Sequence, residues 1–194
     1  IRTALRWLID DGDVNAAQGA TAALWRYWAA RGHLNEGIAW IAESLSLGST
    51  GDDEIRARAH NSAGCLAYYL GDYGEARAHF EANLDLSRRT GDDRGIAHAL
   101  NNVATIAVDQ DDGSAAQEAY EEYLELAHRL GDDELLAPGY YNMGLVHFSA
   151  GDLPEARRHF ERSDKHWQAA GDVGSVYHAR TALAEVALCE GDLD

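Results

Sequence analysis

The feature that most constrains this 194-residue chain is a glycine followed by an aspartate, a pair that returns every 20 residues over most of the sequence. From Gly51 onward the spacing has one gap at Asp111, where the glycine is displaced to Gly113. Glycine adopts the left-handed conformation that ends a helix, and the following aspartate accepts hydrogen bonds from the first amides of the next helix. Each period therefore predicts one helix and one tight turn. The pairs begin at Gly12, Gly51, Gly71, Gly91, Gly131, Gly151, Gly171 and Gly191, and Gly32 marks one more turn.

Alternate segments differ, so the repeating unit is a 40-residue helix pair. The sequence Gly-Asp-Tyr-Gly-Glu-Ala-Arg-Ala-His-Phe at 71–80 returns as Gly-Asp-Leu-Pro-Glu-Ala-Arg-Arg-His-Phe at 151–160. Small residues in phase are expected where two helices approach closely, and in-phase aromatic residues are expected to fill the space beside them. The small residues are Gly64, Ala104, Gly144 and Ala184 in one helix and Ala76, Ala116 and Ala156 in its partner, and the aromatic residues are Phe80, Tyr120 and Phe160.

This order of small residue, aromatic, Gly-Asp-Tyr turn, alanine, aromatic and leucine resembles the tetratricopeptide repeat. The usual unit of that family has about 34 residues, and the longer unit looks like the extended variant of bacterial signalling regulators. The resemblance implies an all-α fold, a right-handed superhelical solenoid of antiparallel helix pairs. We expect helices over 2–10, 15–31, 34–48, 54–70, 73–90, 94–110, 114–130, 134–150, 153–170 and 174–190, with Pro138 delaying or kinking the eighth.

The expected organisation is a single repeat array over 1–194. It comprises a junction helix at 1–14, repeats at 15–53, 54–93, 94–133 and 134–173, and a truncated repeat at 174–194. Residues 1–10 look like the second helix of a preceding pair, and 191–194 look like the start of a further helix, so we expect a fragment of a larger protein. The segment 22–37 resembles the junction where repeats begin in bacterial multidomain regulators, which carry a signal-transduction NTPase module and often a LuxR-type or SARP-type DNA-binding domain.

Composition excludes several functions. Acidic residues number 33 against 16 basic ones, for a formal charge of −17, which repels phosphate backbones and argues against a nucleic-acid partner. No apolar run approaches the roughly 20 residues that span a bilayer, so no membrane partner is expected. Cys65 and Cys189 match no metal spacing and are expected to be reduced, helix-packing thiols, which favours a cytoplasmic location.

The sequence shows no catalytic constellation, so we expect neither an enzyme nor a cofactor. No His-Glu-x-x-His motif occurs, and His159 and His166, seven residues apart, fit a solvated helix face better than a metal site. The four glutamates at 118, 121, 122 and 125 likewise fit a solvated acidic face better than acid–base catalysis.

A binding groove is the remaining candidate. In tetratricopeptide arrays the first helix of each pair lines the concave face, and residues four and seven apart on a helix share a face. Asparagine side chains there could bond the backbone of a protein or peptide partner, and aromatic ones could receive its apolar side chains. The expected groove residues are Arg58, Asn61, Cys65, Tyr68, Asn101, Thr105, Tyr141, Leu145, Phe148 and Glu185.

The sequence pattern leaves alternatives open. The same residues could simply be exposed helix positions, or they could line a sensing module for a peptide or a small molecule. The leading hypothesis is a protein-interaction scaffold, the sensor or partner-binding arm of a bacterial multidomain transcriptional regulator. The rest of the parent chain is expected to contact both ends of the array. The net negative charge predicts a partner that is neutral or basic where it makes contact.

Overall fold

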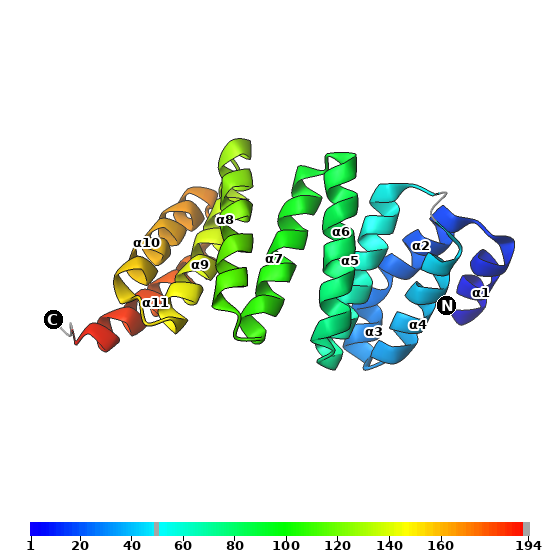
Figure 1. The fold of residues 1–194 in the computed structure, drawn as a ribbon, viewed down its shortest axis with the longest axis horizontal. Coiled ribbons are helices and arrows are strands. Elements are labelled where there is room, and N and C mark those ends of the chain that lie inside the picture. Colours follow the sequence, from blue (N-terminus) through cyan, green and yellow to red (C-terminus); the bar gives the residue numbers. More distant parts are fainter. Residues whose placement is uncertain (49–50, 192–194) are drawn as a thin grey trace. The chain divides into compact units, whose positions relative to one another are not determined.

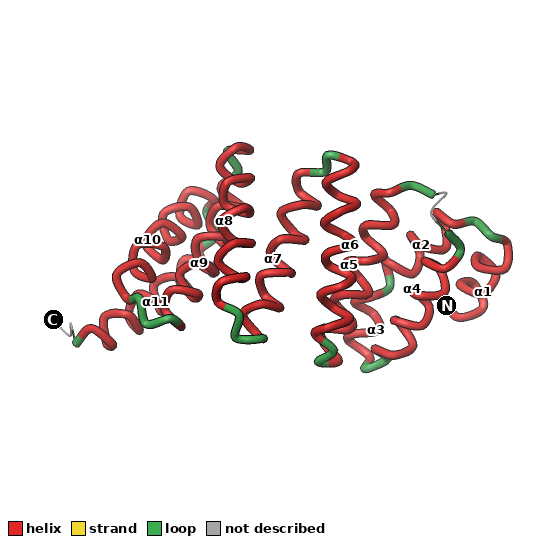
Figure 2. The backbone as a smooth tube through the Cα atoms, in the orientation of Figure 1, coloured by secondary structure: helices red, strands yellow, loops and turns green. Residues whose placement is uncertain are grey.

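The computed structural model describes residues 1–48 and 51–191, and over these residues it contains helices and no strand (Figure 1; Figure 2). The helix start expected at 191–194 falls largely on residues 192–194, which lie outside the described part. None of the described helices is long and apolar enough to span a bilayer. The helices are α1 (Arg2–Asp11), α2 (Val14–Ala23), α3 (Trp25–Arg31), α4 (Leu34–Ser46), α5 (Asp53–Leu70), α6 (Tyr73–Thr90), α7 (Asp93–Asp109), α8 (Gly113–Leu130), α9 (Asp133–Ser149), α10 (Leu153–Ala170) and α11 (Val173–Glu190).

The chain divides into two compact units, Ile1–Ile106 (unit 1) and Ala107–Asp194 (unit 2). In unit 1, α5 packs against α6 and against α2 and α4. In unit 2, α9 packs against α8 and α10, and α10 packs against α11. Each unit is therefore built from adjoining helices in the all-α repeat manner that the 40-residue period predicts. The right-handed twist and the repeat boundaries stay predictions.

The turns between helices have the predicted chemistry. Gly71 has φ +79°, and the Asp72 side chain accepts a hydrogen bond from the amide of Glu75 at 3.0 Å. At the interrupted turn, Asp111 occupies the left-handed conformation with φ 60°, the one non-glycine residue to do so in the described chain. Asp112 still caps α8 by accepting from the amide of Ala115 at 3.1 Å. The aspartate of the motif therefore caps the helix even where the glycine is displaced.

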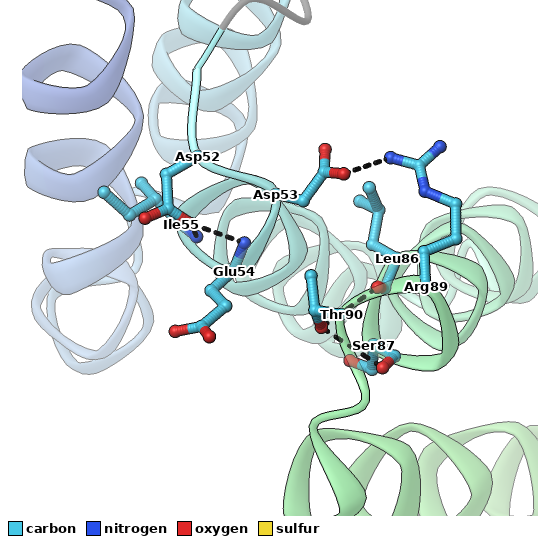
Figure 3. Close-up of polar contacts among 8 residues, drawn as sticks. All are labelled: Asp52, Asp53, Glu54, Ile55, Leu86, Ser87, Arg89 and Thr90. Carbon is cyan, nitrogen blue, oxygen red and sulfur yellow. Dashed lines mark hydrogen bonds and ion pairs between the residues drawn. The ribbon is translucent and has the colours of Figure 1, made fainter.

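Side-chain hydrogen bonds and an ion pair also stabilise helix ends within unit 1. Figure 3 shows the start of α5 beside the end of α6. Asp52 accepts from the amide of Glu54 at 2.8 Å, and the neighbouring Asp53 carboxylate pairs with Arg89 of α6 at 2.5 Å. The Thr90 hydroxyl donates to two carbonyls of the preceding turn, both at 3.2 Å. The Asp52 and Thr90 side chains thus pair with backbone groups near the helix termini, and the Asp53–Arg89 ion pair joins the two helices.

The close approaches predicted from the small residues are confirmed in both units. A Cβ atom on Gly64 would lie 2.6 Å from the Phe80 ring, and one on Gly144 would lie 2.5 Å from the Phe160 ring. Phe80 is 3% exposed and Phe160 is 1% exposed. Four alanines of the pattern are fully buried: Ala76, Ala104, Ala116 and Ala156. Tyr120 is buried as well.

One predicted helix is broken in the structure. The expected helix 15–31 divides at Leu24 into α2 and α3. The amide of Leu24 bonds to the carbonyl of Thr21, three residues back, and the buried Thr21 hydroxyl donates to the carbonyls of Ala17 and Gln18. Such threonine back-bonding competes with the regular ladder and bends helices. The prediction was wrong here because it rested on the glycine–aspartate turns, which mark helix ends but not a break between two turns.

Two further expectations fail in α11. Ala184 is exposed, although it is in phase with Gly64, Ala104 and Gly144. Gly64 and Gly144 each meet an aromatic ring sixteen positions later, Phe80 and Phe160. Cys189 is exposed rather than packed, while Cys65 is half-buried, and neither forms a disulfide.

Pro138 lies inside α9, where a kink or a delayed start was expected. The helix nevertheless begins at Asp133, where Asp132 accepts a hydrogen bond from the amide of Glu134 at 3.0 Å. The proline occupies the second turn and removes one amide from the ladder. The start of the helix is therefore not delayed.

Candidate functional site

None of the predicted groove residues of α5 is fully buried, although Cys65 and Tyr68 pack against the core cluster that contains Phe80. Arg58 is exposed, and Asn61, Cys65 and Tyr68 are half-buried. The opposite face of the helix carries small and apolar residues that are buried, namely Ala59, Ala63, Leu66 and Ala67. One face of α5 thus packs into the fold, and the other presents polar and aromatic groups.

The contact from α7 to α5 is made by a residue that the sequence analysis passed over. Asn102 Nδ2 donates to Asn61 Oδ1 at 2.9 Å. The predicted neighbours Asn101 and Thr105 are half-buried, and the Thr105 hydroxyl donates to the Asn101 carbonyl at 2.8 Å. The Asn-Asn pair at 101–102 could have indicated that Asn102 also borders the groove. Adjacent helix positions are only 100° apart, so both side chains can border the same groove.

Four adjoining pockets follow α5 on this face, and we call them together the unit 1 groove. A pocket of about 170 Å³ is lined by Cys65, Tyr68, Tyr69, Phe80, Asn102 and Thr105. One of about 310 Å³, between α2, α3 and α5, is lined by Gly19, Ala22, Ala23, Trp25, Arg26, Arg58, Asn61 and Ser62. One of about 550 Å³ is lined by Trp25, Arg26, Ala29, Ala30, Leu34 and Tyr69. The fourth, also about 310 Å³, includes Glu54, Arg58, Asn61, Asp92, Arg94 and His98. Because neighbouring pockets share lining residues, they form one continuous surface.

Aromatic rings form the rim of this groove. The Trp25 and Tyr69 rings stack with centroids 6.5 Å apart, and Tyr69 is 59% exposed. The Tyr68 ring contacts the Tyr69 ring edge-on, with centroids 6.0 Å apart. The centroid of the Tyr73 ring, at the start of α6, lies 5.8 Å from that of Tyr68. A cluster of rings with one exposed member offers apolar contact area that is already ordered.

The groove contains one thiol. Burial raises the pKa of Cys65 to about 11, with the nearby Arg26 charge acting in the opposite direction. The thiol is therefore protonated at neutral pH, and a protonated thiol is a poor nucleophile and a poor metal ligand. Its Sγ lies 4.0 Å from Asn61 Nδ2, which makes it a weak acceptor in the wall of the groove.

In unit 2 the predicted aromatic residues serve mainly as core. Tyr141 is half-buried, and its ring lies 5.6 Å from the Phe160 ring and 5.4 Å from the Trp167 ring. Burial raises the pKa of Tyr141, and the charge of Glu185 adds to the effect. Phe148 packs against the cluster that contains Phe160. Leu145, at 40% exposed, and Glu185 are accessible.

Histidines gather at two further places. His60 and His79 lie with their Nδ1 atoms 3.0 Å apart, and burial lowers the pKa of both, that of His60 to about 4. In unit 2 the rings of His147 and His159 stack at 5.1 Å, and burial together with the His147 charge lowers the pKa of His159 to about 4. Across residues 1–48 and 51–191, no three histidine, cysteine or acidic side chains are placed to hold a metal ion.

Comparison with known families and structures agrees with this architecture. The family model described as Tetratricopeptide repeat matches residues 55–129. BtubC (BKLC) from P. vanneervenii is similar in structure with a TM-score of 0.82 and 19% identity, covering 98% of this chain and 83% of that one. No curated protein matches the sequence.

Two further proteins are also similar in structure. One is a Signal Transduction ATPase with Numerous Domains protein with a tetratricopeptide repeat sensor, from Pyrococcus horikoshii. It has a TM-score of 0.82 and 14% identity over 90% of this chain and 28% of that one. The other is a Rap protein complexed with competence and sporulation factor, with a TM-score of 0.70 and 18% identity over 86% and 47% of the two chains. The resemblance inferred from the repeat pattern is confirmed, and at these identities the structural likeness establishes the fold.

Proposed function

We propose that this tetratricopeptide repeat chain is a protein-interaction scaffold that binds an extended segment of a partner protein in the unit 1 groove. The observation that carries the proposal is the run of adjoining pockets along α5, in which the amides of Asn61 and Asn102 lie near the exposed ring of Tyr69. An extended peptide needs hydrogen bonds to its backbone and pockets for alternate side chains. The groove offers both.

The amide pair suits backbone recognition. Each asparagine side chain has two N–H donors and a carbonyl acceptor. The bond from Asn102 Nδ2 to Asn61 Oδ1 uses one donor and part of one acceptor, and it holds both side chains in place. Recognition by groups that are already ordered loses less conformational entropy on binding.

We further propose that the binding surface continues along the predicted face of α7, α9 and α11, with repeats at 15–53, 54–93, 94–133, 134–173 and 174–194. In that arrangement Asn101, Leu145 and Glu185 extend the surface begun by Arg58 and Asn61. Stacked repeats turn a fixed period into a line of side chains, which supports this extension.

The parent protein proposed for this segment is a cytoplasmic bacterial multidomain transcriptional regulator, in which the repeats form the sensor or partner-binding arm. The support comes from the similar structures, which include a signal-transduction ATPase with a repeat sensor and a Rap protein complexed with a factor. A co-precipitation of the full-length parent with its regulated partner tests this assignment.

The groove itself is tested with a library of random twelve-residue peptides displayed on phage. Peptides enriched on the wild-type chain are synthesised and titrated calorimetrically against Asn61→Ala, Tyr69→Ala and the control Asp85→Ala. Asp85 is exposed on α6, outside the groove. We expect Asn61→Ala to weaken binding by about 1–3 kcal/mol, since it removes a partially desolvated hydrogen-bonding group.

The control variant should bind as the wild type does, and circular dichroism should show unchanged helix content in all three variants. If Asn61→Ala and Tyr69→Ala bind the enriched peptides as tightly as Asp85→Ala does, peptides bind elsewhere on the chain. The groove assignment is then wrong.

A further inference from the structure

Basic side chains gather in one pocket of a strongly acidic chain. The pocket between α2, α3 and α5 is lined by Arg26 and Arg58 together with Trp25, Asn61 and Ser62. Its remaining lining residues are glycine and alanine, so no acidic residue borders it. The chain as a whole carries 33 acidic residues against 16 basic ones. A pocket with two guanidinium groups and no carboxylate is therefore a local reversal of the overall charge.

Several arginines elsewhere in unit 1 are paired with acids. Arg2 contacts Glu36 at 2.6 Å, Arg6 contacts Glu43 at 2.5 Å, and Arg89 contacts Asp53 at 2.5 Å. Within the described residues, no ion pair is formed by either of the two arginines that line the pocket. Their charges are consequently available to a ligand.

The two available arginines are held by different elements of the groove. Arg26 lies at the start of α3, and its guanidinium sits over the Trp25 ring at 4.7 Å from the ring centroid. Arg58 lies on α5, one helical turn before Asn61. A stacked guanidinium keeps its N–H edges free for hydrogen bonding while its face is covered. Arginine in this state binds carboxylates through two parallel hydrogen bonds.

An apolar surface adjoins this basic pocket. Trp25 and Arg26 also line the neighbouring pocket, whose other members are Ala29, Ala30, Leu34 and Tyr69. On the opposite flank, the pocket between α5 and α7 contains Glu54 and Asp92. The groove therefore presents an apolar section, a basic section and a mixed section in order, and the acidic groups of the mixed section are Glu54 of α5 and Asp92 before α7.

We propose that the unit 1 groove selects an acidic segment of its partner, with an aspartate or glutamate carboxylate bound between Arg26 and Arg58 and an apolar side chain seated against Trp25 and Tyr69. This inference rests on the proposed function and names the chemistry of the partner. It replaces the neutral or basic partner expected from the net charge, because charges within a Debye length of about 10 Å dominate what a pocket attracts.

The test compares Arg26→Gln/Arg58→Gln with the control Arg31→Gln/Lys165→Gln, which removes the same charge from exposed positions outside the groove. Random twelve-residue peptides on phage are selected on the wild-type chain, and the net charge of the enriched pool is counted. Enriched peptides are then synthesised in two forms, one as selected and one with every aspartate and glutamate replaced by its amide. Both forms are titrated by fluorescence anisotropy against both variants at two salt concentrations.

We expect the wild-type pool to be acidic. The amide forms should bind at least 10-fold more weakly to the wild-type chain. The groove double variant should lose at least 10-fold for the acidic forms and little for the amide forms, while the control double variant stays within twofold of wild type. Raising the salt concentration should weaken the acidic forms alone.

A neutral or basic pool overturns the inference, and so does an acidic pool that the groove double variant binds as tightly as the control does. If neutral peptides are enriched and lose affinity for Asn61→Ala, the proposed function stands and the acidic selectivity is wrong. If no peptide is enriched over a phage carrying no insert, both proposals fall.

Discussion

The helix pairs α5–α6 and α9–α10 lie two 40-residue periods apart, and they are alike where they pack. Gly64 and Gly144 each leave room for one aromatic ring, supplied by Phe80 and Phe160. The alanines at 76 and 156 are fully buried in both pairs. The residues that let two helices approach are therefore repeated without change, because close packing tolerates few alternatives in size.

The other face of the first helix differs between the same two pairs. Asn61 corresponds to Tyr141 by position, and Tyr69 corresponds to Ser149. Asn61 bonds to a neighbouring helix through Asn102, whereas Tyr141 packs on Phe160 and Trp167. The comparison shows that the period fixes the packing and leaves the exposed face open to vary. Differences in binding should therefore arise from that face.

The largest expected effect breaks the packing in both pairs. Phe80→Ala and Phe160→Ala should each lower the free energy of unfolding by about 3–5 kcal/mol, because each removes a buried ring and leaves a cavity beside a glycine. Urea denaturation followed by circular dichroism measures this. Tyr69→Ala, which truncates a largely exposed ring, serves as the control and should cost far less. A large loss in one pair and none in the other would contradict the equivalence of the two pairs.

A smaller effect is expected from filling the glycine positions. Gly64→Ala and Gly144→Ala place a Cβ atom within 2.6 Å of a buried ring. The overpacking should cost about 1–3 kcal/mol and outweigh the gain in helix propensity. Gly74→Ala is the matched control, since its nearest neighbour would be 3.7 Å away, and it should leave stability unchanged or raised. Stabilisation by all three substitutions would show that the rings have room to shift.

Acid should weaken both pairs through their histidines. The pKa of His60 and that of His159 are each lowered to about 4. The unfolded chain therefore binds more protons between about pH 6.5 and pH 4. Their neutral forms stabilise the fold fully above about pH 6.5, and this contribution is lost as pH falls toward 4, by about 1 kcal/mol for each histidine once partial exposure is allowed for.

Chemical denaturation across that range tests the titration. The variant His60→Tyr introduces the residue type that stands at the equivalent position, Tyr140. It should flatten the dependence of the free energy of unfolding on pH. The control His33→Gln, at an exposed site, should leave it unchanged. A wild-type stability that is flat between pH 6.5 and pH 4 would contradict the account.

The smallest expected effect concerns the interrupted turn. Asp111 adopts φ 60°, a conformation in which glycine carries less steric cost. Asp111→Gly should raise the free energy of unfolding by about 0.5–1 kcal/mol, and Asp111→Ala should lower it. Thermal denaturation of wild type and both variants checks this order of stability, with the midpoint of Asp111→Gly expected to be highest and that of Asp111→Ala lowest. The reverse order would mean that the aspartate side chain stabilises this turn.

Much of the fold could be predicted from the spacing of glycines, alanines and aromatic residues, because a turn in the left-handed conformation and a close helix contact each demand a particular side-chain size. The break at Leu24 could not, since it depends on a buried hydroxyl that competes for backbone carbonyls. The residues of the candidate site were harder to predict than the fold. A helical period selects a face but not a residue, so Asn101 was chosen where Asn102 makes the contact. It also cannot show that Tyr141 rests on the next helix.

The most direct test of the central claim, that the unit 1 groove binds a partner segment, is a nuclear magnetic resonance titration of the labelled chain with an enriched peptide. The account predicts that the side-chain amide signals of Asn61 and Asn102 and the indole N–H signal of Trp25 shift together and saturate at one peptide per chain. The indole signal of Trp7, which is exposed on α1 outside the groove, should stay in place. Shifts confined to α1, α6 or α11, with the Asn61, Asn102 and Trp25 signals unmoved at saturation, would contradict it.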